Sequence, residues 1–401
     1  MKITYFNYVW DIEGISAGAA TKAREIIGGL NRHGHETSLI WRTPQPNGHV
    51  TVSDKVRSSL KPKLQKYLHE PKKLVRNVPN LMQEWRILKN EKPDILFARL
   101  ELYNVTAALL SKMLSVPLAI EADCPVSYEH KNFYGKAYQH IGNLSEKLEL
   151  QTLHSADAVI AISTILKNYY VEQGIAAEKI HVIPNGADPE KFAPRPKPAE
   201  LVKAYDLNGK TVIGWIGALV GWSGIEKMLS MARQILQSDR QAAFMMVGGG
   251  DNQALFQKEL QAGEFADRVI LPGSVPHEAV GDYLACMDIV LAPYPKLPFW
   301  YASSMKIFEY MAAGKALISS AVGQVNEVIQ DGQNGLLYDP DNAEELTEKV
   351  KTLLKDEALR QRLGEQARSD LLANYTWSHH AKQIAEIFQE IVARKQNVQH
   401  T

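Results

Sequence analysis

The chain alternates between short apolar runs and helical stretches, and the alternation occurs in two separate series. The first series contains the runs KITYFNY, TSLIWR, PDILFAR, PLAIEAD, ADAVIAIS and IHVIPNG, between residues 2 and 186. The second contains TVIGWIGAL, AAFMMVGGG, RVILPGSV, DIVLAPY, KALISSA and GLLYD, between residues 211 and 339. Strands that alternate with helices form parallel sheets whose two faces are covered by helices. The pattern predicts an α/β fold built from two doubly wound parallel sheets.

The two series are separated by PNGADPEKFAPRPKPAE, a stretch rich in proline and charge. Such a composition is typical of a linker, which we place at about residues 185–205. A chain of 401 residues also exceeds the size of one ordinary core. We therefore predict a first domain over residues 1–190, a second over 205–375, and a helix over 376–401 that packs back on the first domain. Open α/β sheets bind ligands at the carboxyl ends of their strands, so the expected ligand site is a cleft between the domains.

The composition argues against several classes of function. The chain has 45 basic and 45 acidic residues, which is not the balance of a general nucleic-acid binder. Its two cysteines, Cys124 and Cys286, lie far apart, and no cluster of His, Cys and Asp has metal-ligand spacing, so no metal is expected. No run reaches about 18 consecutive apolar residues, and the first residues lack the apolar core of a signal peptide. We expect a cytoplasmic protein.

The segment SSMKIFEYMAAG, from Ser303 to Gly314, has the pattern of a short helix with a serine cap at its start and a glycine at its end. Two charged residues, Lys306 and Glu309, interrupt its apolar sequence. A lysine in a first turn opposes the helix dipole, whereas a bound anion would offset that cost. Lys306 therefore indicates a phosphate site, and Glu309 lies one turn further on nearly the same face. A solvent-exposed Lys–Glu pair is the alternative.

Three segments together resemble the retaining nucleotide-sugar glycosyltransferases of glycosyltransferase family 4. They are ADAVIAISTILKNYYVEQGIAAEKIHVIPNGADPEKF, VILPGSVPHEAVGDYLACMDIVLAPY and SSMKIFEYMAAGKALISSAVGQVNEVIQDGQNGLLYDPDN, which follow the family's order and spacing over most of residues 155–345. The resemblance implies the GT-B fold, in which two Rossmann-like domains face each other across a cleft. It also implies that a sugar passes from a nucleotide-diphosphate donor to an acceptor hydroxyl, with retention at the anomeric carbon and without a metal or other cofactor. The acceptor would be a sugar, a lipid-linked sugar or another hydroxyl compound, in the synthesis of a polysaccharide, glycolipid or glycoconjugate.

The resemblance gives donor-binding roles to residues of the second domain. Lys306 would bind the leaving diphosphate and so act in catalysis, and Glu309 would accept hydrogen bonds from the ribose hydroxyls. Backbone groups near Gly217 would hold the diphosphate, and those near Val275 would hold the nucleobase.

This chain departs from the family pattern in two places. The family usually has a glutamate at position 301, where this chain has a tyrosine, and it usually has cations in the loop that here reads ALVGWS and ends at Ser223. Contacts to the donor sugar are therefore expected from Tyr301, Ser303 and Ser304, and Lys306 would carry more of the phosphate charge.

Polar residues follow the strands of the first domain. Asp123, which follows the run PLAIEA, occupies a position where many family members have a histidine beside the donor sugar. A carboxylate there could orient the acceptor hydroxyl or stabilise positive charge at the anomeric carbon, so Asp123 is a catalytic candidate. Glu121 and Arg99 are candidates for acceptor binding. Gly18, in the Gly/Ala-rich loop expected over residues 14–20, would let the backbone approach the donor. An ordinary strand-end acid and a plain strand–helix turn are the alternatives.

The segment over residues 55–76 is strongly basic and contains a single acidic residue, Glu70. Leu60, Leu64, Tyr67 and Leu68 recur in it at helical spacing. An amphipathic basic helix can lie on an anionic membrane, so peripheral binding to the inner face of a membrane is one prediction for this segment. A solvated charged face is the other.

Three other functions compete with glycosyl transfer. A nucleotide-sugar epimerase of the same fold would need an acid/base pair at the sugar carbon, which the sequence does not clearly show. A bilobal nucleotide-sugar binding protein would not need Lys306 and Glu309 on one helical turn. The departures at Tyr301 and Ser223 also fit an inactive relative that still binds the nucleotide.

Overall fold

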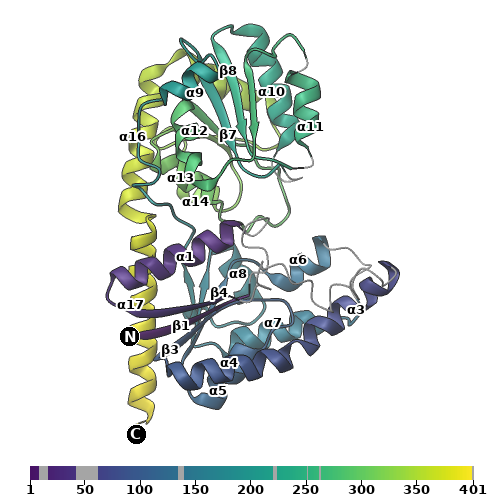
Figure 1. Cartoon of the computed structure of the whole chain (residues 1–401), viewed down its shortest axis with the longest axis vertical. Helices are drawn as coiled ribbons and strands as arrows, with labels where there is room; N and C mark the ends of the chain where they lie inside the picture. The colour runs from purple at the N-terminus through teal and green to yellow at the C-terminus, as the bar shows by residue number, and fades with distance from the viewer. Residues whose placement is uncertain are drawn as a thin grey trace. The chain divides into compact units, whose positions relative to one another are not determined.

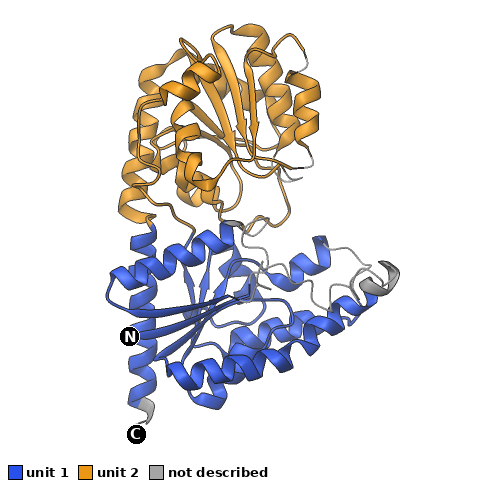
Figure 2. Cartoon of the chain, in the orientation of Figure 1, with its two compact units in different colours: residues 1–184, 377–401 blue, residues 185–376 orange. Residues whose placement is uncertain are grey.

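The computed structural model describes residues 1–8, 17–41, 62–133, 140–219, 224–250, 252–261 and 263–399. The chain forms two compact units, which Figure 2 shows in different colours. Unit 1 contains residues 1–184 and 377–401, and unit 2 contains residues 185–376. The chain therefore leaves unit 1 once and returns to it for its last helix.

Unit 1 is built on a six-stranded parallel sheet with the strand order β2-β1-β3-β4-β5-β6. Its strands are β1 (Lys2–Asn7), β2 (Glu36–Trp41), β3 (Ile95–Arg99), β4 (Leu118–Ala122), β5 (Ala158–Ala161) and β6 (Ile180–Val182). Its helices are α1 (Ala17–Arg32), α3 (Pro62–Val75), α4 (Asn77–Glu91), α5 (Thr106–Leu114), α6 (Val126–Phe133), α7 (Leu144–Ser155), α8 (Thr164–Glu172) and α17 (Trp377–Gln399). The order reverses between β1 and β3, so the carboxyl ends of these neighbours form the position where such sheets bind ligands.

The last helix belongs to the core of unit 1. Ile384 and Phe388 of α17 are buried in one apolar cluster with Ile3 and Phe97 of the sheet. Gly29 of α1 allows this packing, because a Cβ atom at Gly29 would lie 2.4 Å from the Cβ atom of Ala381. Figure 1 shows α1 and α17 crossing beside the strands of this unit.

Unit 2 is built on a second six-stranded parallel sheet, with the order β12-β11-β10-β7-β8-β9. Its strands are β7 (Thr211–Ile216), β8 (Ala242–Val247), β9 (Val269–Gly273), β10 (Ile289–Ala292), β11 (Ala316–Ser320) and β12 (Leu336–Tyr338). Its α-helices are α9 (Ala199–Ala204), α10 (Ile225–Ser238), α11 (Gln253–Phe256), α12 (Val280–Cys286), α13 (Met305–Ala312), α14 (Val325–Val328), α15 (Ala343–Lys355) and α16 (Glu357–Asn374). The order reverses between β7 and β10, and α13 follows β10.

The two parallel sheets confirm the predicted fold class. Their strands are apolar because both faces are covered; β8, for example, is buried along its whole length. Helix α10 shows the matching periodicity, with its buried residues on one face and polar residues on the other. Figure 1 shows helices on both sides of each sheet. Within the described residues, no helix is long and apolar enough to cross a membrane.

Two local predictions need correction. Helix α1 begins at Ala17, so Gly18 lies in its first turn and not in a loop that ends at Ala20. The reason is that three of the four residues from Ala17 to Ala20 are alanines, which favour helix. Glu70 is also not part of a solvated basic face, because its side chain is buried and hydrogen-bonded.

Candidate active site

Helix α13 presents the two charged residues singled out from the sequence. Ser304 occupies the N-cap position, but its side chain makes no capping bond and instead accepts a hydrogen bond from the Tyr294 hydroxyl at 2.5 Å. The Tyr310 hydroxyl accepts a hydrogen bond from the backbone N–H of Ile216 at 2.8 Å, which ties α13 to the end of β7. Helix α13 therefore lies at the carboxyl end of the sheet.

Lys306 lies over an aromatic ring. Its Nζ atom is 4.1 Å from the ring centre of Trp215, a buried residue of β7. Gly217 has a positive φ of 151°, and a Cβ atom there would lie 2.6 Å from Lys306 Nζ, so only glycine leaves room for this arrangement. Among the described residues no carboxylate lies within ion-pair distance of Lys306, and the predicted alternative of a surface pair with Glu309 is not seen. Burial lowers the pKa of Lys306 to about 7, and the charge of Glu309 offsets this only in part.

Glu309 is half-buried one turn further along the helix. Burial raises the pKa of its carboxyl group to about 7, against the smaller opposing effects of Lys306 and Lys191. Near neutral pH the Glu309 carboxyl group is therefore partly protonated and partly ionised. A carboxyl group in this state suits a ligand that supplies hydroxyl donors and excludes water.

Unit 2 also contains a pair of basic side chains that was not predicted from the sequence. Lys191 Nζ lies 3.2 Å from Nδ1 of His277, in the segment that follows Val275 and strand β9. An ammonium group can only donate, so Nδ1 accepts and the His277 proton sits on Nε2. Burial, reinforced by the charge of Lys191, lowers the pKa of His277. The only sequence signal was the position of His277 two residues after Val275, since Lys191 lies 86 residues away along the chain.

The residues predicted to contact the donor sugar are engaged with the protein. The backbone N–H of Asn185 donates to Ser303 Oγ at 2.9 Å, and Asn185 Nδ2 donates to the Ser303 carbonyl at 2.6 Å. Tyr301 is buried, with its ring centre 5.1 Å from that of Phe299. The Ser303 hydroxyl still has a proton to donate to a ligand, whereas the Tyr301 ring is part of an aromatic pair. Val275 is half-buried and packs against the core of unit 2.

In unit 1, strands β1, β3 and β4 bring together a buried network of charges. Glu121 is 1% exposed and accepts a hydrogen bond from the Tyr5 hydroxyl. Lys22 Nζ, on α1, lies 3.1 Å from a Glu121 oxygen and donates a hydrogen bond to Asp123. Arg99 Nη1 lies 2.5 Å from Asp123 Oδ2 and 3.9 Å from Glu121 Oε2. The structure thus joins the three predicted residues of this unit and adds Lys22 and Tyr5.

The ionisation of this network follows from its pairing. Burial opposes the charge on Asp123, but Arg99 and Lys22 outweigh it and lower the pKa of Asp123 below its ordinary value. Burial likewise opposes the charge on Lys22, yet Asp123 and Glu121 raise its pKa. Two cations therefore face two carboxylates, and the negative charge of Asp123 is balanced by the cations beside it.

Other predicted positions lie elsewhere. Gly18 is exposed in the first turn of α1, which also contains residues 17, 19 and 20 of the expected loop, while residues 14–16 lie outside the described residues. Ser223 and the loop from residue 220 also lie outside them. In the basic segment, residues 55–61 are not described, and Tyr67 is 61% exposed with its ring stacked on His140. In the part of the chain that the structure describes, no group of three or more His, Cys, Asp or Glu side chains could hold a metal ion.

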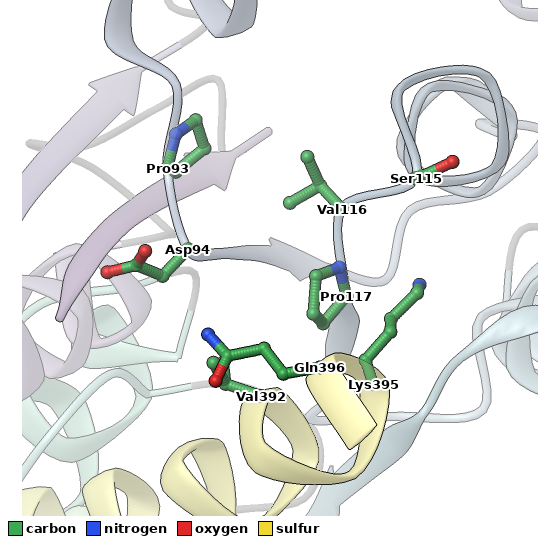
Figure 3. Close-up of a pocket in the computed structure, with 8 residues that line it drawn as sticks. All are labelled: Pro93, Asp94, Ser115, Val116, Pro117, Val392, Lys395 and Gln396. Carbon is green, nitrogen blue, oxygen red and sulfur yellow. The ribbon is translucent and has the colours of Figure 1, made fainter. Parts of the chain in front are cut away.

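A cavity of about 160 Å³ lies in unit 1, at the other end of its sheet from the charge network (Figure 3). Its lining residues precede β3 and β4 or come from the end of α17: Pro93, Asp94, Ser115, Val116, Pro117, Val392, Lys395 and Gln396. These positions are at the amino ends of the strands, opposite the edge where parallel sheets bind substrates. We therefore do not place the active site in this cavity.

Two family models match the chain. The model described as Glycosyltransferase Family 4 matches residues 16–191, and the model described as Glycosyl transferases group 1 matches residues 199–370. The α-D-kanosaminyltransferase of Streptomyces kanamyceticus is 26% identical over 71% of this chain and 73% of its own length.

Solved structures share the fold over nearly the whole chain. The sucrose-phosphate synthase of Thermosynechococcus elongatus has a TM-score of 0.74 at 18% identity, over 98% of this chain and 100% of its own. Anabaena Alr3699/HepE, solved with UDP, has a TM-score of 0.69 at 18% identity, over 97% and 100% of the two chains, and was also solved with UDP-glucose. These likenesses show the fold, and the family models show the membership: the chain belongs to the family-4-type glycosyltransferases with the GT-B fold.

Proposed function

We propose that the chain is a retaining glycosyltransferase that moves a sugar from a nucleotide-diphosphate donor to an acceptor hydroxyl, in the synthesis of a polysaccharide, glycolipid or glycoconjugate. The observation that carries this proposal is the state of Lys306. It is a half-buried cation without a carboxylate partner among the described residues, in the first turn of α13. A diphosphate would bring the missing negative charge and would also use the free N–H groups of the helix terminus.

The proposed reaction needs little covalent chemistry from the protein. The bond between the anomeric carbon and the diphosphate oxygen breaks while a bond from the acceptor oxygen forms on the same face. The acceptor proton passes to the leaving diphosphate. Catalysis then rests on holding both substrates and on stabilising charge at the leaving group, so Lys306 counts as catalytic. Both roles depend on a lysine that becomes fully protonated when the diphosphate binds.

The remaining groups of unit 2 suit the rest of a nucleotide. Glu309 would accept hydrogen bonds from the ribose hydroxyls, and Val275 and Gly217 would contribute backbone groups. Lys191 and His277 offer only donors, so they favour acceptor oxygens on the ribose or base. Uridine nucleotides are the first donors to test, because Alr3699/HepE has been solved with UDP and with UDP-glucose.

The charge network of unit 1 is the proposed acceptor side. Asp123 and Arg99 keep 14% and 16% of their side chains exposed, whereas Glu121 and Lys22 are almost fully buried. We assign Asp123 and Arg99 to direct contact with the acceptor and Glu121 to holding them in place. Asp123 would accept a hydrogen bond from the reacting hydroxyl and fix its direction. The acceptor is a sugar, a lipid-linked sugar or another hydroxyl compound, and the enzyme would work in the cytoplasm or on the inner face of a membrane.

The matches above are to glycosyltransferases, and the epimerase alternative gains no support from them. A protein that binds nucleotide sugars without transferring them is the remaining alternative. The two differ in one measurable respect, because only the enzyme turns over its donor when an acceptor is present.

A donor screen tests the proposal. Wild type, Lys306→Ala and Glu309→Ala are mixed with UDP-, GDP-, ADP- and dTDP-sugars and followed by thermal shift, with Lys203→Ala on α9 as an exposed control. We expect a shift with one nucleotide class, which the control retains and the two site variants lose. NMR of a transferred sugar then reads the anomeric configuration. No shift with any donor, an unaffected shift in both site variants, or an inverted product would refute the assignment.

A further inference from the structure

Three neighbouring helices of unit 1 expose large apolar side chains. Val75 ends α3 and is 69% exposed, while Val78 and Met82 of α4 are 62% and 55% exposed. Trp85, one turn further on α4, is 36% exposed. The intervals of four and three residues between Val78, Met82 and Trp85 place these three side chains on one face of α4. The buried face of α4 carries Leu88 and Glu84 instead.

Helix α5 adds to the same surface. It packs against α4, and Figure 1 draws the two helices next to each other along one edge of unit 1. Leu109 and Met113, one turn apart on α5, are 44% and 61% exposed. We call the set Val75, Val78, Met82, Trp85, Leu109 and Met113 the α4–α5 face. Single exposed apolar residues are ordinary, but a group of six on packed helices marks an interaction site.

The exposed charges of α4 and α5 all have one sign. They belong to Arg86, Lys89 and Lys112. Of the acidic residues of α4, Glu84 is 1% exposed, and Glu91 is half-buried and accepts a hydrogen bond from Thr4. This local bias is notable in a chain with no net charge.

We propose that the α4–α5 face docks on an anionic lipid surface. The apolar side chains would enter the boundary between headgroups and acyl chains, and the cations would meet the lipid phosphates. Lys89 shows the required geometry, because its Nζ atom lies over the ring of Trp85, 4.4 Å from the ring centre. A tryptophan with a neighbouring cation is suited to the membrane–water interface.

The charges also argue against a second copy of this chain as the occupant. A two-fold dimer places the same surface against itself, so Arg86, Lys89 and Lys112 would face their own copies without a counter-charge. The membrane contact expected for residues 55–76 would then be made by helices that follow most of that segment. It adds to the proposed function without depending on it, because lipid binding is measured without a donor or acceptor.

Vesicle flotation of the full chain tests the proposal. We expect the protein to float with phosphatidylcholine vesicles that contain phosphatidylglycerol and to stay behind with phosphatidylcholine alone. Arg86→Gln and Lys89→Gln should each weaken binding about fivefold, and Met82→Ser should weaken it about tenfold. The matched controls are Lys382→Gln on α17 and Leu372→Ser on α16, which alter residues with 64% and 48% exposure outside this face.

The same experiment can overturn the proposal in three ways. Absence of binding to anionic vesicles would do so, as would binding that the α4–α5 variants and the controls reduce equally. The third contrary result would come from light scattering. If the protein is a dimer and Met82→Ser dissociates it, a second copy covers the face. The thermal shift that nucleotide sugars cause should be the same in these variants as in the wild type. This measurement keeps the test of lipid binding separate from the test of glycosyl transfer.

Discussion

Replacing Lys306 by methionine should stabilise the unliganded chain while it weakens donor binding. Methionine keeps an unbranched side chain that fits beside Gly217 and over Trp215. It removes an ammonium group that is partly desolvated and has no carboxylate within ion-pair distance among the described residues. The substitution should therefore raise stability and lower donor affinity, because the unliganded protein lacks the negative charge that a diphosphate would supply.

The magnitude follows from the pKa of Lys306. A pKa of about 7 in place of the ordinary 10.5 means that the folded chain disfavours the ammonium by about 5 kcal/mol relative to the amine. That cost is present in full below about pH 7 and disappears as the pH rises towards 10.5. Residual hydration and the lost cation–π contact with Trp215, about 0.5–2 kcal/mol, reduce the net gain. We expect about 1–3 kcal/mol at pH 6, or roughly 2–4 °C in the unfolding midpoint for each kcal/mol in a unit of this size.

Thermal unfolding of Lys306→Met between about pH 6 and pH 10 checks this reasoning, together with calorimetric titration of the nucleotide. Loss of one charge-assisted contact should weaken nucleotide binding about 10- to 100-fold. Lys315→Met is the matched control, because Lys315 also has a lowered pKa, of about 8, but donates to the carbonyls of Ala285 and Met287. The control should lose stability and keep nucleotide affinity. A lower midpoint for Lys306→Met at pH 6, or unchanged nucleotide affinity, would refute the argument.

Three further predictions concern carboxyl groups that are buried or half-buried. At pH values above about 7, Glu309→Gln should raise the temperature of the unfolding midpoint, and near pH 4 it should leave that temperature unchanged. The reason is that the raised pKa of Glu309 makes the folded chain disfavour the carboxylate as the pH rises from 4.5 to about 7. An equal gain at both pH values would contradict this. Lys22→Met leaves Glu121 without its nearest cation and should cost about 3–5 kcal/mol in urea unfolding, against less than about 1 kcal/mol for the exposed control Lys382→Met. Glu70→Gln should cost about 1.5–3 kcal/mol at neutral pH, and the cost should shrink in acid, because hydrogen bonds outweigh burial and lower the pKa of Glu70.

The strands and the charged helix could be predicted because their causes are local. Strands buried on both faces are continuous apolar runs, and each apolar run of the two series contains or overlaps a strand of the structure. The helix over residues 305–312 was predicted from its apolar pattern and its flanking serine and glycine. Lys306 stood out because a cation in a first turn conflicts with the helix dipole. The order of strands in each sheet could not be predicted this way, because pairing joins segments that are distant along the chain.

The missed residues act through partners that are far away in sequence. Lys22 reaches Asp123 across 101 residues, and Lys191 reaches His277 across 86. A lysine on an amphipathic helix gives no local sign of such a partner. Glu70 was misassigned for the same reason, since its partners include the backbone N–H groups of residues 140 and 141, 70 positions further along the chain.

The two charged clusters differ in their balance, and that difference bears on which substrate each can hold. In unit 1, Arg99 and Lys22 are matched by Asp123 and Glu121, so the network is preorganised and nearly neutral. In unit 2, Lys306 has no carboxylate within ion-pair distance among the described residues, and Glu309 is partly protonated near neutral pH. An anionic ligand therefore gains more in unit 2, where it completes the charge balance, than in unit 1, where it would have to displace an existing pair. This asymmetry favours the diphosphate donor on α13 and a neutral hydroxyl-bearing group of the acceptor beside Asp123.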